Sequence, residues 1–518
     1  MTYPVLLRLN SDTMSRILFL LGIIGLLFSC KPSGNSPQTA GVVASDYREP
    51  YRPQYHFSPS SGWMNDPNGM VFHNGEYHLF FQHYPDSTVW GPMHWGHAVS
   101  TDLVHWEQLP IALYPDSLGY IFSGSAVVDR NNTTGFGTAD KPALVAMFTY
   151  HDPSGEKAGR NDFQTQGLAY SNDNGRTWVK FKGNPVLKNP GIRDFRDPKV
   201  RWWEEQKKWL LTLAVKDHVE FYSSPDMKAW TRLSAFGEDI GAHGGVWECP
   251  DFFPMTDAQG QQRWVLLLSI NPGGPQGGSA TQYFVGSFNG KFFVPQDTLT
   301  RWIDYGADNY AGVTWSDIPE ADGRRLLLGW MSNWQYANVV PTGVWRSAMT
   351  LPREIRMMSR GGVHELQFRP ADELEHITGE PVAFSDSAAL TATASRIRFK
   401  SAGTEGFSFS LHNAAQERVT LTLSDGKLSF DRRQSGRSDF SDVFPAVHEI
   451  DLTGVDLREV DIWLDAASLE IFINEGERVI TELVFPTVAW NQIRLVRSNP
   501  EFTVQPVSYI WPEVVVKK

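Results

Sequence analysis

Short apolar runs separated by turn residues dominate the first 360 residues of the chain. Runs such as "KPALVAMFTY", "RWVLLLSI" and "RRLLLGWM" have the length and apolar content of buried strands. No long stretch repeats its apolar residues with the helical period of about 3.6 residues. The pattern therefore predicts an all-β fold.

Two imperfect repeats organise these runs. The first is a turn that begins with a Ser-x-Asp-like sequence and ends in Trp, and it occurs as "STDLVHW" (100–106), "SNDNGRTW" (171–178) and "SSPDMKAW" (223–230). The second is a polar loop that enters a strand-like run, and its five markers are Asp66, Ser123, Asp197, Glu248 and Asp308. The markers lie roughly fifty to seventy-five residues apart, and the longest interval contains the polar insertion "HDPSGEKAGRNDFQTQ". Five such units of four short strands predict a five-bladed β-propeller over residues 46–360.

The pattern changes after residue 360. Residues 361–375 are expected to form a linker with a possible short helix. Over residues 376–518, apolar and polar residues alternate, as in "RVTLTLSDGKLSFDR", and the segments "SDGK" and "NEGE" are typical of hairpin turns. This alternation predicts a C-terminal antiparallel β-sandwich that follows the propeller.

The first residues of the chain predict a targeting segment rather than part of the fold. Arg16 precedes a twelve-residue apolar run, residues 17–28, which suits a signal peptide and is too short to span a membrane. We expect translation to start at Met14, because residues 1–13 do not resemble the start of a signal peptide.

The segment "LFSC" resembles the lipobox of bacterial lipoproteins, with Cys30 as the lipidated residue. Residues 1–30 would then be a lipoprotein signal peptide, and the small and polar residues 31–45 would be a flexible tether. We expect a lipid anchor in the bacterial cell envelope, on the periplasmic face of the outer membrane rather than at the cell surface, with plain secretion as the alternative. Cys249 is the only other cysteine, so we expect no disulfide.

Charge and composition narrow the class of partner. A net charge of −12 disfavours nucleic acids and anionic membrane surfaces. The chain contains 19 Trp and 16 Tyr, whose flat rings suit the apolar faces of sugars. A neutral carbohydrate fits these features better than a charged partner does.

Three of the five markers carry carboxylates that should meet. The first strand of each propeller blade lines the central channel, so we expect Asp66, Asp197 and Glu248 to converge at one mouth of it. The run "NDPNG" (65–69) indicates a tight loop that directs Asp66 into this space. Carboxylates confined together repel one another, which is typical of a functional site rather than of a core. Such acids predict glycoside hydrolysis, in which one protonates the leaving oxygen and another attacks or stabilises an oxocarbenium-like centre.

The sequence around each of these acids resembles a motif of glycoside hydrolase family 32, the β-fructofuranosidases, which include invertases, inulinases and levanases. The three motifs are "WMNDPNG" (63–69), "FRDP" (195–198) and "WECPD" (247–251). They occur in the family's order, each at the start of a separate predicted blade. The resemblance covers the chain from about residue 46 onwards and implies the same propeller and sandwich.

The resemblance implies a role for each acid. Asp66 would be the nucleophile that attacks C2 of a fructosyl unit, and Glu248 would be the general acid and then the general base. Asp197, with Arg196 beside it, would hold sugar hydroxyls and stabilise the transition state, and Arg196 would help to keep Asp197 ionised. The residues expected to desolvate the Glu248 carboxyl, so that it keeps its proton, are Trp247, Phe252 and Phe253.

The resemblance also implies a set of sugar contacts, namely Trp63, Asn65, Gln82, Trp90, Phe122, Ser123, Arg196, Asp308 and Trp334. Trp90 and Trp95 lie in the loop 84–97, and we expect them to wall off a pocket for one terminal fructosyl ring. We expect no cofactor and no metal site, because the spacing of the histidines fits no zinc pattern.

The leading interpretation is therefore a retaining hydrolase that removes terminal β-D-fructofuranosyl residues from fructans of the inulin or levan type, and from sucrose. The alternatives within the enzymes are an endo-acting levanase or inulinase, a fructosyltransferase, and an arabinan-cleaving glycosidase on a similar propeller. The alternative outside the enzymes is a carbohydrate-binding lipoprotein, which the presence of all three acids disfavours.

Overall fold

The structure is a computed structural model, and it describes residues 45, 47–401 and 405–510. The predicted signal peptide and Cys30 lie outside the described residues. Strands dominate the described part, together with one short α-helix, α1 (Pro153–Lys157), and the 3₁₀ turns η1 (Glu204–Gln206) and η2 (Asp372–Ile377). None of the described helices is long and apolar enough to cross a membrane.

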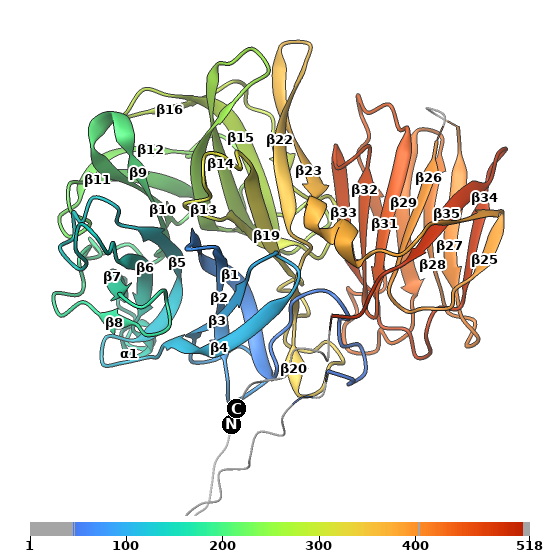
Figure 1. The fold of residues 1–518 in the computed structure, drawn as a ribbon, viewed down its shortest axis with the longest axis horizontal. Coiled ribbons are helices and arrows are strands. Elements are labelled where there is room, and N and C mark those ends of the chain that lie inside the picture. Colours follow the sequence, from blue (N-terminus) through green and yellow to red (C-terminus); the bar gives the residue numbers. More distant parts are fainter. Residues whose placement is uncertain (1–44, 46, 402–404, 511–518) are drawn as a thin grey trace, which may run out of the picture. The chain divides into compact units, whose positions relative to one another are not determined.

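Five antiparallel sheets form the predicted propeller (Figure 1), and their strands follow one another in chain order from the inner strand outwards. The first blade contains β1 (Gly62–His73), β2 (Glu76–Tyr84), β3 (His94–Ser100) and β4 (Trp106–Leu113). The second contains β5 (Tyr120–Val128), β6 (Leu144–His151), β7 (Gln164–Ser171) and β8 (Val179–Lys180). The third contains β9 (Phe195–Trp203), β10 (Lys208–Val215), β11 (His218–Ser224) and β12 (Thr231–Phe236).

The last two blades each carry one additional short strand. The fourth contains β13 (Val246–Thr256), β14 (Gln262–Asn271), β15 (Ala280–Phe288) and β16 (Phe293–Pro295), with β17 (Arg301–Trp302) beside β15. The fifth contains β18 (Tyr310–Thr314), β19 (Arg325–Met331), β22 (Arg353–Arg360) and β23 (Val363–Pro370), with β21 (Ala348–Met349) beside β19. The ring closes where β20 (Trp345–Arg346) pairs in parallel with β1.

The Trp-ended repeat has the same role in the first three blades, where it connects the third strand to the fourth. In the third blade, Asp226 accepts hydrogen bonds from the N–H groups of Lys228 and Ala229 at 2.9 and 3.0 Å. The indole of Trp230 donates to the carbonyl of Met227 at 2.9 Å. The same Asp and Trp bonds recur in the other two turns, so the repeat is a self-contained turn with its own anchor.

The pairing of every inner strand with its neighbour is interrupted near the start of the strand. In each case two residues are left unpaired: Asn65–Asp66, Phe122–Ser123, Asp197–Pro198, Cys249–Pro250 and Ala311–Gly312. A β-bulge of this kind bends a strand and redirects its side chains. The interpretation of "NDPNG" as a tight loop is wrong in one respect, because this run lies inside the continuous strand β1.

Two six-stranded sheets form the C-terminal sandwich. One contains, in spatial order, β24 (Val382–Ser385), β35 (Glu501–Pro506), β26 (Ser395–Lys400), β31 (Glu459–Asp465), β32 (Ser468–Ile473) and β33 (Arg478–Leu483). The other contains β25 (Ser387–Ala389), β34 (Gln492–Val496), β27 (Phe407–His412), β28 (Arg418–Ser424), β29 (Lys427–Gln434) and β30 (Val447–Ile450). Their inward-facing apolar residues form one separate core, as the alternating pattern requires.

The expected linker at residues 361–375 does not separate the two domains. Strand β23 occupies most of it and pairs along its whole length with β22, which makes it the outer strand of the fifth blade. The sandwich is also joined to the propeller by buried ion pairs. Arg353 of β22 contacts Glu470 of β32 at 2.6 Å, and both side chains are fully buried.

Candidate active site

The bulges of the first three blades bring Asn65–Asp66, Phe122–Ser123 and Asp197 to one pocket, and Glu248 reaches it from the residue before the fourth bulge. Asp197 and Cys249 adopt the left-handed backbone that lets a bulged residue turn away from its ladder, with φ of 62° and 47°. The contacts between blades follow directly. The hydroxyl of Ser123 donates to Asp66, and the N–H of Cys249 donates to Asp197. Asp66, Asp197 and Glu248 therefore line one pocket, as the sequence predicted.

Asp66 has one occupied carboxylate oxygen and one free one. Ser123 Oγ donates to Asp66 Oδ2 at 2.8 Å, and the thiol sulfur of Cys249 lies 3.5 Å from the same oxygen. Oδ1 is shielded from solvent and makes no hydrogen bond to any residue that the structure describes. Burial raises the pKa of Asp66, and the charge of Glu248 raises it further, while the Asn65 side chain acts in the opposite direction. Ser123 therefore holds the carboxylate through Oδ2, and Oδ1 is left without a partner among the described residues.

Asp197 is the most strongly perturbed of the three acids. Burial raises its pKa to about 7, the charge of Arg196 lowers it, and the charges of Glu248 and Asp66 raise it. Cys249 N–H donates to Asp197 Oδ2 at 3.0 Å. Arg196 does not pair directly with Asp197 as expected, because its guanidinium is engaged elsewhere, and burial of Asp197 outweighs the effect of this charge.

Glu248 is held by two donors. Arg196 Nε donates to Glu248 Oε1 at 3.0 Å, and the hydroxyl of Tyr310 donates to Oε2. Arg196 also contacts Asp194 at 2.7 Å, which fixes the orientation of its guanidinium. These three residues, Arg196, Glu248 and Tyr310, occupy the same register position, the last pair before the bulge in their inner strands.

The aromatic neighbours of Glu248 in the sequence do not surround its carboxyl. Trp247 and Phe252 pack in the core between the third and fourth blades, and Phe253 packs in a different core cluster. Both oxygens of Glu248 instead contact polar groups. The sequence analysis missed Tyr310, because it placed the start of the fifth inner strand two residues too early.

The pocket above the three acids has a volume of about 270 Å³ and receives residues from all five blades. Among the predicted residues, those that line it are Asn65, Asp66, Gln82, Trp90, Phe122, Ser123, Arg196, Asp197, Glu248 and Trp334. The lining residues that the sequence analysis did not name are His151, Glu156, Phe163, Gln164, Asp194 and Asn271. The pocket is small and polar at its base, with aromatic side chains in its wall.

Comparison with known proteins agrees with this geometry. The family described as "Glycosyl hydrolases family 32 N-terminal domain" matches residues 56–370, and "Glycosyl hydrolases family 32 C terminal" matches residues 367–510. The chain belongs to glycoside hydrolase family 32. It is therefore a glycosidase, and the resemblance inferred from the three acid motifs is confirmed.

Individual relatives of this family 32 chain cover most of its length. A levanase from Bacillus subtilis is 46% identical over 496 residues, which span 90% of this chain and 72% of the relative. The crystal structure of an exo-inulinase from Aspergillus awamori has a TM-score of 0.81 at 34% identity and covers 90% of this chain and all of that one (100%). A β-fructofuranosidase from Schwanniomyces occidentalis, complexed with fructosyl-erythritol, has a TM-score of 0.78 at 30% identity over 89% of this chain and 99% of that one.

Trp63 lies behind the pocket of this family 32 enzyme rather than in its lining. Its side chain is fully buried, and its indole N–H donates to Asn65 Oδ1 at 2.7 Å. Its ring stacks on Trp334 with 5.8 Å between centroids. Trp63 therefore positions two residues that do line the pocket.

Only one of the two tryptophans in the loop 84–97 lines the pocket. Trp90 is 40% exposed and meets the ring of Phe122 edge-on at 6.0 Å. Trp95 is fully buried, and its indole donates to the carbonyl of Phe122 at 2.9 Å. The expectation that Trp95 forms part of the wall is wrong, because strand β3 turns it into the core between the first two blades.

Asp308 does not line the pocket either. Its carboxylate is fully buried and contacts Arg432 of the sandwich at 2.6 Å and the hydroxyl of Tyr336 at 2.5 Å. Asp308 lies two residues before β18 begins and therefore precedes the bulge at Ala311–Gly312. Its side chain does not face the channel for this reason. Asp308 thus joins the propeller to the sandwich in this structure.

The polar insertion of the second blade forms one wall of the pocket. It contributes His151, Glu156, Phe163 and Gln164, and part of it folds into α1. The His151 ring stacks on Phe122 at 4.3 Å, and its Nε2 lies 3.1 Å from Glu156. Gln164 accepts a hydrogen bond from the N–H of Phe195 at 2.9 Å, which ties the insertion to the strand of Asp197. In the sequence, this wall was indicated by the long interval between the markers Ser123 and Asp197.

We predict that Asp197→Asn abolishes most activity and stabilises the fold at alkaline pH. Because burial raises the folded pKa of Asp197 above the unfolded value of 3.8, the folded state loses stability as pH rises from about 4 through about 7. The amide of the variant carries no charge, so the variant does not lose stability as the pH rises through this range. Melting curves should show the variant above the wild type by about 3 °C or more at pH 8, with a much smaller difference at pH 5.

Asp226→Asn provides the matched control. Burial acts to raise the pKa of Asp226, but hydrogen bonds from the N–H groups of Ala229 and Lys228 outweigh it and lower the pKa. Its charged form therefore stabilises the fold above the unfolded pKa, and its amide variant should melt below the wild type at pH 8. A lower melting temperature of Asp197→Asn at pH 8 would contradict the account of Asp197.

Proposed function

We propose that this chain is a retaining exo-β-fructosidase that releases terminal β-D-fructofuranosyl residues from fructans of the inulin or levan type, and from sucrose. The observation that carries the proposal is the convergence of Asp66, Asp197 and Glu248 on one pocket, where Ser123 Oγ holds Asp66 through Oδ2. Oδ1 has no hydrogen-bond partner among the described residues, so it is the oxygen assigned to the attack.

In the first step, Asp66 Oδ1 forms a bond to C2 of the fructosyl ring as the bond from C2 to the leaving oxygen breaks. The leaving oxygen takes the proton of Glu248, so the products are a fructosyl ester of Asp66 and the rest of the substrate. Glu248 must therefore enter this step protonated. In the free enzyme its two oxygens contact Arg196 and the Tyr310 hydroxyl, and a protonated Glu248 can donate to that hydroxyl until the leaving oxygen takes the proton.

In the second step, water attacks C2, Glu248 takes its proton, and the ester bond to Asp66 breaks. In this step Glu248 acts as a carboxylate, and contacts with Arg196 and Tyr310 hold its two oxygens in place. Two inversions at C2 return the β configuration, so the reaction retains the anomeric stereochemistry. Asp197 is the third acid of the site and lies close enough to Asp66 and Glu248 for their charges to affect its pKa. Its carboxylate can stabilise the positive charge that develops at C2.

The small size of the pocket supports exo-action. Its volume of about 270 Å³ is just below the usual range for ligand pockets, about 300–1,000 Å³, and suits one sugar ring better than a chain. Trp90, the insertion wall and Trp334 surround it on different blades. An endo-acting enzyme needs a cleft that is open on both sides of the acids. The relatives of this chain include a levanase and an exo-inulinase.

Product analysis tests the proposal directly. Incubated briefly with inulin and with levan, the enzyme should release fructose as the only early product from at least one of them, and it should release fructose and glucose from sucrose. A ladder of oligosaccharides at low conversion would show endo-action instead. Chain lengthening in place of fructose release at high sucrose concentration would show a fructosyltransferase.

We further infer that the enzyme is a lipoprotein of the bacterial cell envelope, anchored through Cys30 and facing the periplasm. The support is the lipobox-like "LFSC" after a twelve-residue apolar run, together with the polar residues 31–45. Lys31 directly after Cys30, with no acidic run, favours the outer membrane as the destination.

Expression of Cys30→Ala should yield a soluble enzyme, or an uncleaved precursor that incorporates no labelled fatty acid. The wild type should partition with the outer membrane and incorporate the label. Removal of the wild-type enzyme by protease treatment of intact cells would contradict the periplasmic orientation, and equal labelling of both forms would contradict lipidation at Cys30.

A further inference from the structure

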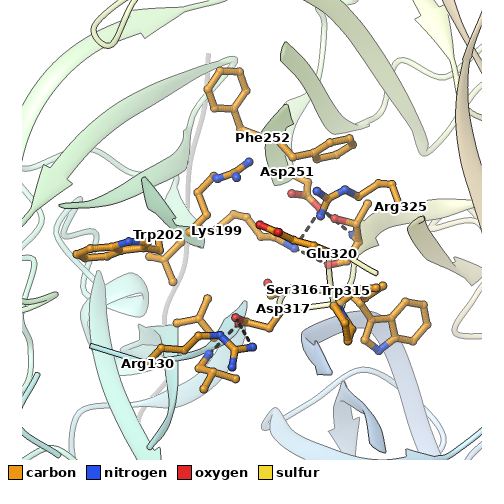
Figure 2. A pocket seen from close by; sticks show the side chains of 18 of the residues that line it. Arg130, Lys199, Trp202, Asp251, Phe252, Trp315, Ser316, Asp317, Glu320 and Arg325 are labelled. Carbon is orange, nitrogen blue, oxygen red and sulfur yellow. Dashed lines mark hydrogen bonds and ion pairs between the residues drawn. The ribbon is translucent and has the colours of Figure 1, made fainter. Parts of the chain in front are cut away.

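A second cavity lies farther along the same inner strands that carry the catalytic acids. Its volume is about 740 Å³, larger than that of the active-site pocket. On β9, Asp197 lines the active-site pocket, whereas Lys199 and Arg201, two and four residues later, line the second cavity. On β13, Glu248 and Asp251 are divided between the two cavities in the same way. Figure 2 shows the labelled side chains around this cavity.

Most charged groups in this cavity have partners. Lys199 contacts Asp251 at 3.0 Å and donates to the carbonyl of Thr314 at 2.7 Å. Arg130 lies 3.4 Å from Asp317. Asp317 also accepts a hydrogen bond from the N–H of Val128 at 2.8 Å, and dashed lines mark the contacts around Lys199 and Asp317 in Figure 2. Arg324, which also lines the cavity, forms paired bonds to acidic residues outside its lining.

Arg201 and Arg325 are different, because neither forms a hydrogen bond or an ion pair through its side chain to any residue that the structure describes. Their Nε atoms are shielded from solvent and have no acceptor. Each guanidinium is instead positioned by an aromatic ring: Arg201 lies over Trp264 at 5.2 Å, and Arg325 lies over Phe253 at 4.8 Å. The rings cover one face of each guanidinium and leave the N–H groups at its edge without acceptors.

Two unpaired guanidinium groups are an unfavourable arrangement. Burial lowers the pKa of Arg201 to about 10, and the charge of Arg325 lowers it further. Burial also lowers the pKa of Arg325. The charge of Asp251 acts in the opposite direction on both arginines, but burial outweighs it, and Asp251 is already paired with Lys199. Both arginines line the same cavity.

We propose that this cavity binds a tetrahedral oxyanion of the phosphate or sulfate class between Arg201 and Arg325. A guanidinium group can donate two parallel N–H bonds to such an oxyanion. The aromatic rings hold the guanidinium groups of Arg201 and Arg325 in place before the anion binds. Lys199 stays paired with Asp251, so this pair adds no net charge, and the two arginines supply the positive charge for the anion. The cavity is larger than one phosphate ion, so it also admits the sugar of a phosphate ester.

Thermal unfolding of the full chain tests the proposal. At pH 7 and constant ionic strength, chloride is replaced stepwise by inorganic phosphate or by sulfate. Specific binding should raise the melting temperature of the wild type along a saturable curve, by about 2 °C or more when the anion exceeds its Kd 100-fold. A rise that stays linear in anion concentration is a general salt effect and would overturn the proposal, as would no rise.

Arg201→Met and Arg325→Met identify the site. Methionine keeps a flexible stem against the aromatic ring and removes the unpaired charge, so in chloride each variant should melt at or above the wild-type temperature. The saturable rise with phosphate should disappear in both. If the saturable rise persists in both variants, the anion binds elsewhere and the proposal fails. Two separate variants are used so that the test still works if one of them does not fold.

Arg433→Gln is the matched control, because Arg433 is an exposed arginine of the sandwich paired with Asp431. It should keep the full phosphate response. Titration with glucose 6-phosphate then separates the two sources of the oxyanion. A Kd at least tenfold below that of inorganic phosphate assigns the cavity to a phosphate ester, and equal or weaker binding assigns it to the free ion.

Discussion

The bulge near the start of each inner strand is the constraint on which the active site depends. Inner strands of a propeller have no partner on the channel side, so a residue that leaves the ladder there can turn toward the channel. All five strands use this position, and Asp66, Ser123, Asp197 and Cys249 are among the residues that it frees. Proline follows three of these four residues, and its missing N–H costs nothing where the ladder is already broken.

The electrostatics of the channel follow from this crowding. Burial and mutual repulsion raise the pKa of Asp66 and of Asp197, so the two acids oppose the stability of the fold at neutral pH. The cost arises from placing both acids in the same pocket as Glu248. Farther along β9, Arg201 shares the second cavity with Arg325 of β19, and neither side chain has an ion-pair or hydrogen-bond partner among the described residues.

Sequence reasoning predicted the blades and the acids because both depend on local chemistry. Asp66 and its turn-forming neighbours form a contiguous motif, and the motif's position within a repeat unit locates the strand. Asp308, Tyr310 and Trp95 were misassigned or missed because their roles depend on strand register. A shift of two residues in the start of the strand decides whether Asp308 or Tyr310 reaches the active site. Trp95 is buried against a neighbouring blade, and a single sequence does not show which residues pack between blades. The second-blade wall was visible only as an insertion of unexplained length.

The division of labour between Asp66 and Glu248 is most directly tested by the burst of nitrophenolate from 4-nitrophenyl β-D-fructofuranoside. This leaving group needs little protonation, so Glu248→Ala should still release about one equivalent of nitrophenolate per enzyme rapidly and then turn over slowly, while its activity on sucrose falls at least about 100-fold. Asp66→Ala should give no burst, because no covalent intermediate can form. A burst from Asp66→Ala, or an equal loss of rate on both substrates in Glu248→Ala, would contradict the assignment of nucleophile and acid.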